Sequence, residues 1–233
     1  MSKKIVLLAV CALVLVGSQS MAAIYETSFE ASQGWPVAAP HTEITAGSVD
    51  GWSITRWGGQ AFSEDWRSHT NQAVYMTMDN SASVELLRSF APTSKATVEM
   101  WATTVASGPF QVRMMNSAGQ DLANFAMWNG VIYKDMFGWV SSGDTYTPGA
   151  FIKLVYAIDV AQNKWTLSTF GNNPQVIQGT LGASGNVAKL QIGTNWTGGG
   201  GFGYAVVDDL VVTPEPFTMA LMGLGALFAV RRK

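Results

Sequence analysis

The carboxylates best suited to binding a metal ion stand in the strand-like segment 204–212. Asp208 and Asp209 have apolar neighbours on both sides. Because strand side chains alternate between two faces, at least one of the pair should point into the core. A buried carboxylate needs a counter-charge or a metal ion, and oxygen ligands suit calcium. We therefore expect a structural calcium at Glu30, Asp208 and Asp209, and no required cofactor. In the alternative, one aspartate is solvated and the other accepts backbone N–H bonds.

Tryptophan supplies a second kind of chemistry, because flat exposed indoles stack on sugar rings. The chain has nine tryptophans, and several stand in loop-rich stretches or beside Gly and Asn. The predicted glycan contacts are Trp52, Trp57, Trp66, Trp128 and Trp196. The alternative is a core role, which we expect for Trp101 and Trp165 on alternating strands.

A catalytic site is not indicated. Paired carboxylates on one strand would suit glycoside hydrolysis, but Glu99-Met100-Trp101 lacks the further acids that such a strand needs. The two histidines, His41 and His69, lie apart in polar segments and outside any hydrolase or metalloprotease motif. We therefore predict a protein that is not an enzyme, with a carbohydrate-active enzyme or a lectin-like module as the alternative.

The C-terminal segment combines three chemistries in a fixed order. Pro214-Glu215-Pro216 is followed by an uncharged run over 217–230 and then by Arg231-Arg232-Lys233. This order favours a membrane helix with cations on the cytoplasmic side. Fourteen residues span only about 21 Å as a helix, less than a bilayer core. Snorkelling of Arg231 and Arg232, local thinning of the bilayer and inclusion of residues 214–216 at the outer interface would cover the deficit.

These residues resemble the PEP-CTERM sorting signal of Gram-negative bacteria, in which Pro214, Glu215, Pro216, Arg231 and Arg232 carry the match. The resemblance implies anchoring in the inner membrane and processing by an exosortase, a membrane transpeptidase. It also implies delivery to the cell surface or to the exopolysaccharide matrix, with exopolysaccharide as a further partner.

The N-terminus has the pattern of a signal peptide over 1–22, with cleavage between Ala22 and Ala23. Together with the sorting segment 214–233, this leaves one predicted domain over 23–213. That part holds nine of the 14 basic and fifteen of the 16 acidic residues, a net charge of −6. An acidic domain without a basic patch argues against nucleic acid as a partner.

Between the two ends the chain has the short alternating segments typical of β-strands. They include 74–78, 83–90, 97–103, 110–114, 151–160, 164–170, 189–192 and 204–212. Turn sequences such as Asn129-Gly130 separate them. About a dozen strands in one domain predict an all-β, two-sheet antiparallel sandwich or jelly roll.

The segment Tyr146–Asp159, followed by Gln162–Leu167, resembles the central hairpin of concanavalin A-like and laminin-G-like jelly rolls. Phe29-Glu30 with Gly34-Trp35 and Val207–Val211 are similar to the first and last strands of such domains, and also to those of galactose-binding jelly rolls. The resemblance implies that the first and last strands are neighbours.

Overall fold

The structure is a computed structural model that describes residues 25–35, 42–44, 47–59, 61–64, 72–78, 83–105, 109–135, 138–194 and 203–213. Within these residues the chain forms seventeen β-strands and one 3-10 turn, η1 (Ala31–Gln33). The predicted signal peptide and the sorting segment 214–233 lie outside the described residues.

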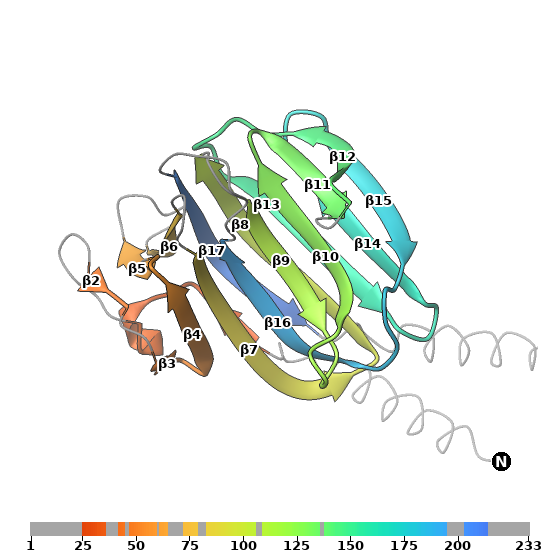
Figure 1. Cartoon of the computed structure of the whole chain (residues 1–233), viewed down its shortest axis with the longest axis horizontal. Helices are drawn as coiled ribbons and strands as arrows, with labels where there is room; N and C mark the ends of the chain where they lie inside the picture. Colours follow the sequence, from red (N-terminus) through yellow and green to blue (C-terminus); the bar gives the residue numbers. More distant parts are fainter. Residues whose placement is uncertain are drawn as a thin grey trace, which may run out of the picture.

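The strands form two antiparallel sheets packed face to face, with the eight-stranded sheet in front in Figure 1. The front sheet runs β12 (Val140–Thr145), β11 (Val131–Asp135), β10 (Asp121–Trp128), β9 (Phe110–Met115), β16 (Val187–Thr194), β7 (Ser83–Thr93), β4 (Trp52–Trp57) and β3 (Gly47–Val49).

The nine-stranded sheet lies behind it (Figure 1). It runs β15 (Gln175–Thr180), β14 (Lys164–Thr169), β13 (Ile152–Asp159), β8 (Lys95–Val105), β17 (Gly203–Thr213), β6 (Ala73–Met78), β5 (Ala61–Glu64) and β2 (Thr42–Glu43), with β1 (Tyr25–Thr27) paired to β17.

This arrangement confirms the predicted two-sheet sandwich. The hairpin β13–β14 forms as expected, with Asp159 opposite Lys164, and the first and last strands are paired, with Tyr25 opposite Val212. Asn129 and Gly130 both have positive φ, which suits the tight hairpin turn between β10 and β11.

The core lies between the sheets and is formed by alternate residues of the central strands. In β13 the inward residues Ile152, Leu154, Tyr156 and Ile158 are all buried. Removing such apolar side chains from water stabilises the fold by about 1.5–3 kcal/mol each. The residues between them point outward, so each sheet presents a second face on which functional groups can gather.

Candidate functional site

Polar side chains form a band across the outer face of the eight-stranded sheet. The register places Leu87, Gln191, Arg113 and Asn124 side by side on β7, β16, β9 and β10. The next band over holds Glu85, Gly193 and Gln111. We refer to the polar members as the polar row, which comprises Glu85, Gln111, Arg113, Asp121, Asn124 and Gln191.

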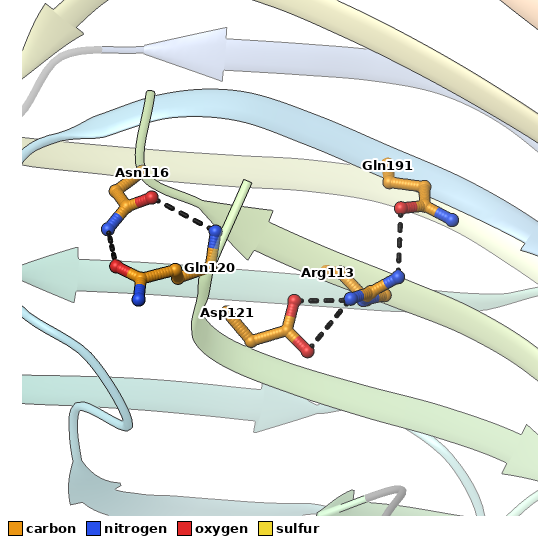
Figure 2. Close-up of polar contacts among 5 residues, drawn as sticks. All are labelled: Arg113, Asn116, Gln120, Asp121 and Gln191. Carbon is orange, nitrogen blue, oxygen red and sulfur yellow. Dashed lines mark hydrogen bonds and ion pairs between the residues drawn. The ribbon is translucent and has the colours of Figure 1, made fainter. Parts of the chain in front are cut away.

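Arg113 holds the polar row together (Figure 2). Its Nε and Nη2 donate to the two carboxylate oxygens of Asp121 at 2.8 and 3.1 Å, and its Nη1 donates to Oε1 of Gln191 at 3.1 Å. Both charged side chains are mostly buried, at 24% and 16% exposure. A bidentate pair of this kind fixes the geometry of both groups.

A separate set of bonds shapes the turn beside it. Asn116 donates from Nδ2 to Gln120 Oε1 at 2.9 Å and accepts from the Gln120 N–H at 3.0 Å (Figure 2). This turn connects β9 to β10 in the register that places Asp121 beside Arg113.

Burial affects two groups of the polar row. Gln191 is 5% exposed, and its Nε2 finds no hydrogen-bond partner among the described residues. Burial raises the pKa of Glu85, and the charge of Arg113 and the nearby Gln191 amide only partly oppose that shift. A buried amide without a partner is costly.

Three aromatic rings lie beside the polar row and form what we call the aromatic cluster: Trp128, Tyr133 and Trp139. The Trp139 ring centroid is 5.1 Å from that of Trp128 and 5.2 Å from that of Tyr133. Trp139 is 37% exposed and has φ 51°. Tyr133 lies directly opposite Ala126, whose other neighbour is Gln111 of the polar row.

The tryptophans predicted as glycan contacts have different environments in the structure. Trp128 lies half-buried in the aromatic cluster. Trp52 is completely buried, which corrects its assignment as a glycan contact: its indole Nε1 donates inward to the Tyr25 hydroxyl at 2.8 Å. Trp57 lies in β4, but its side chain is outside the description, as are Trp66 and Trp196.

Of the two tryptophans expected in the core, Trp101 differs from that expectation. Trp101 lies on the outward face of β8, opposite Asp208 and Lys153, and is only partly buried. Trp165 packs against the core cluster but is likewise only partly buried. Neither indole is fully enclosed, because both lie near the outside of the sandwich.

The acidic residues proposed for calcium are held differently from the prediction. A β-bulge between Asp208 and Val211 shifts the register of β17, with Asp209 at φ 47°. Ala205 and Val207 face the main core before the bulge, and Leu210 and Val212 face it after the bulge. Asp208, although completely buried, therefore lies on the other face of the sheet.

Asp208 Oδ1 accepts from the Asp209 N–H at 2.8 Å, and Glu30 Oε1 is buried without a hydrogen-bond partner among the described residues. Within that part of the chain, no three His, Cys, Asp or Glu side chains converge where an ion could sit. The calcium site at Glu30, Asp208 and Asp209 stays a prediction.

Other predicted features have structural roles or lie outside the description. Glu99 accepts an ion pair from Lys153 at 2.8 Å, with both side chains exposed by about two-fifths. Ala22, Ala23, Pro214, Glu215, Pro216, Arg231 and Arg232 lie outside the described residues. The described part of the chain contains no helix that is long and apolar enough to cross a membrane.

Sequence reasoning missed most of the polar row and part of the aromatic cluster. The available signal was the polar residue at alternate positions, as in Phe110-Gln111-Val112-Arg113-Met114 and Leu190-Gln191-Ile192. Alternation shows that these side chains share a face, but only the strand register shows that they meet.

Comparison with known proteins supports the sandwich fold and the C-terminal sorting motif. The chain shares the fold of a "Sialidase" (TM-score 0.58, 9% identity, 82% of this chain and 19% of that chain). It also shares the fold of "Cellulose induced protein, Cip1" (0.53, 13%, 70% and 90%) and of a carbohydrate esterase from Shiga toxin-encoding bacteriophage phi24B (0.50, 15%, 72% and 91%).

The chain spans about a fifth of the length of that sialidase. No curated protein matches the chain in sequence. Residues 212–233 match the family described as "PEP-CTERM protein-sorting motif", as the order of Pro-Glu-Pro, apolar run and arginines predicts. The chain therefore carries a PEP-CTERM sorting motif that follows a jelly-roll sandwich in the sequence. This motif indicates an exported protein of the cell envelope.

Proposed function

We propose that the protein is a non-catalytic surface or exopolysaccharide-matrix protein of a Gram-negative bacterium, whose sandwich contacts glycan through the aromatic cluster and the polar row. The observation that carries the sorting half of this proposal is the motif at residues 212–233. The juxtaposition of Trp128, Tyr133 and Trp139 with a hydrogen-bonding row supports the glycan half.

The route to the surface follows from the motif. The predicted signal peptide would start export, and the apolar run 217–230 with its basic stop would hold the chain in the inner membrane. An exosortase-type transpeptidase would then act at or near Pro214-Glu215-Pro216. The final strand β17 remains paired to β8 through Thr213, so the tripeptide directly follows a central strand in the sequence.

The glycan contact rests on complementary chemistry. Ring faces of the aromatic cluster would stack on the apolar faces of pyranose units, while the polar row supplies donors and acceptors for their hydroxyls. Asn124, which is partly exposed, lies opposite Arg113 in this row.

The separation of Glu85 and Asp121 argues against these two acids as a catalytic pair. Glu85 on β7 and Asp121 on β10 are separated by β16 and β9, which places their strand axes about 14 Å apart. Glycosidase carboxylates stand about 5–9.5 Å apart. Asp121 is also held at both oxygens by Arg113. In the alternative of a carbohydrate-active enzyme, the purified protein would hydrolyse a polysaccharide.

Replacing Pro214, Glu215 and Pro216 by alanine tests sorting. We expect the variant to keep residues 217–233 and to stay in the inner-membrane fraction, because the transpeptidase loses its recognition sequence. Mass spectrometry of protein from membrane, surface and medium measures this. The control is the conservative substitution Thr218→Ser. A triple-alanine change at Gly171, Asn172 and Asn173 is not used as the control, because that loop is structural. Intact 217–233 in the wild-type surface form would contradict the proposal.

The change Trp139→Ala tests glycan contact. We expect retention on a neutral polysaccharide to weaken about tenfold, because one stacking face is lost, while the unfolding midpoint changes little. Affinity electrophoresis of the full-length protein measures retention. Val176→Ala is the matched control, since Val176 is 76% exposed on the other sheet. Equal retention of the Trp139 variant and the wild type would remove the aromatic cluster as the platform.

A further inference from the structure

A cleft of about 570 Å³ opens at the seam between the two sheets. It lies where β10, β11 and the start of β12 face β14 and β15. Its polar and aromatic lining residues include Asp121, Asn124, Lys134, Asp135, Trp165 and Gln178. We refer to it as the seam cleft. It shares Asp121 and Asn124 with the polar row, but its wall on β14 and β15 belongs to the opposite sheet.

Trp165 forms a fixed aromatic wall in the seam cleft. It lies opposite Gly179 on β15, and a Cβ at Gly179 would come within 2.5 Å of the indole. The missing side chain therefore lets the indole lie across β15, where its Nε1 donates to the Thr180 carbonyl at 3.0 Å. Because this bond and the backbone of Gly179 set the ring orientation, the indole is held in place before any ligand arrives.

A hydroxyl without a partner lies behind this wall. Tyr156 is completely buried, its ring is 6.1 Å from that of Trp165, and its O–H finds no partner among the described residues. Burial, followed by the charges of Asp121 and Asp135, raises the pKa of Tyr156 well above its usual value, so the group stays a neutral donor. The Tyr156 ring therefore backs the Trp165 indole from the core side.

The charges of the seam cleft indicate what kind of ligand it accepts. Asp121 is neutralised by Arg113, and Lys134 stands in the lining beside Asp135. The charges of the lining are therefore balanced and offer no excess of cations to an anionic ligand, and a metal ion would lack a cluster of three acidic, His or Cys ligands in the described residues. Amides, balanced charges and an indole instead match an uncharged polyhydroxyl compound.

The seam cleft lies next to the aromatic cluster. Tyr133 and Asp135 are alternate residues of β11 that share its outer face, about 7 Å apart, and Val140 of the cleft follows Trp139 directly. We propose that the seam cleft is a second subsite for an uncharged oligosaccharide, whose neighbouring units stack on the aromatic cluster. This inference rests on the proposed glycan contact and adds its location, its extent and its charge selectivity.

Calorimetric titration of the full-length protein tests the seam cleft. The probes are cello-, xylo- and β-1,4-galacto-oligosaccharides of two to six units, together with uronate oligosaccharides of equal lengths. For at least one neutral series, we expect the hexamer to bind about tenfold more tightly than the dimer. Trp165→Ala should remove this advantage and leave dimer binding unchanged, whereas Trp139→Ala should weaken both. Uronate hexamers should bind more weakly than neutral ones.

Gln178→Ala keeps the test independent of folding, because Gln178 is an exposed rim residue whose loss should lower hexamer affinity a few-fold without changing the unfolding midpoint. Equal affinities for dimer and hexamer, unaffected by both cleft variants, would overturn the second subsite and leave the proposed glycan contact standing. Uronate binding as strong as neutral binding would overturn the charge selectivity. Absence of binding by any probe would overturn the proposed glycan contact and this inference together.

Discussion

Replacing Asp144 by alanine should destabilise the sandwich by about 3–5 kcal/mol. Asp144 lies on the edge strand β12, is completely buried, and accepts from the N–H groups of Gly171 and Asn173 at 3.0 and 2.8 Å and of Thr145 at 2.7 Å. It therefore ties the edge of one sheet to the β14–β15 turn of the other. Alanine would leave these amides without their acceptor, and chemical denaturation measures the loss.

The same carboxylate should make stability depend on pH. Burial alone would raise the pKa of Asp144, but bonds from the Thr169 hydroxyl and from three backbone amides outweigh it and lower the pKa. A lowered folded pKa means that the stabilisation is complete above the unfolded value of about 3.9 and is lost as the pH falls through the folded value. Acid unfolding should therefore begin at higher pH in Asp144→Asn than in the wild type.

Glu99→Ala is the matched control for Asp144, because it removes a carboxylate from an exposed ion pair and should change stability by less than about 1 kcal/mol. The β14–β15 turn has little room to move and replace the lost acceptor, because it is closely packed. Even a Cβ on Gly171 would collide with the Thr145 carbonyl. A free energy of unfolding for Asp144→Ala equal to that of the control would show that the sheets are not joined through this residue.

Trp52→Ala should destabilise the protein by about 3–5 kcal/mol. The indole is completely buried and packs edge-on against the Tyr25 ring at 5.8 Å. Its Nε1 donates to the Tyr25 hydroxyl, which itself donates to Asp50 Oδ2 at 2.5 Å. Burial, and next the bond to Asp50, raise the pKa of Tyr25 to about 12, so its hydroxyl remains a donor at neutral pH. The substitution would create a cavity and break this chain of bonds.

Two further variants separate packing from bonding at this position. Trp52→Phe keeps most of the ring but loses the N–H, and we expect it to lose about 1 kcal/mol. Trp139→Ala removes an exposed indole and should leave stability nearly unchanged. Thermal and denaturant unfolding of all three proteins measures this contrast. If Trp52→Ala kept wild-type stability but lost glycan retention, Trp52 would be a glycan contact after all.

Much of the fold was predictable from local patterns. Alternation in 97–103, 151–160 and 204–212 identified the central strands, because a strand buried on one face must alternate. Nine of the seventeen strands are not among the named segments, and the residues of two edge strands, β12 and β15, show why. In β12 the buried residues, Ser142 and Asp144, are polar, whereas a core strand normally buries apolar residues. In β15 the apolar residue Val176 is exposed.

The candidate site was less accessible to sequence reasoning. Arg113, Asp121 and Gln191 meet because β9 pairs with both β10 and β16, and pairing partners are set by the whole sandwich. Likewise, nothing near Trp52 in the sequence distinguishes it from Trp139, although one is buried and the other is exposed. The bulge at Asp208–Asp209 also changes which face each aspartate occupies, which simple alternation could not show.

The sequence by itself determined the sorting motif, because the order of Pro214-Glu215-Pro216, an apolar run and two arginines is a linear signal. It also determined the all-β class, through alternation and turn residues that act over a few positions. Only the tertiary structure decided the polar row, the aromatic cluster, the seam cleft and the link made by Asp144. Each of these joins residues from strands far apart in the chain, and strand register, which depends on packing the complete core, sets their distances.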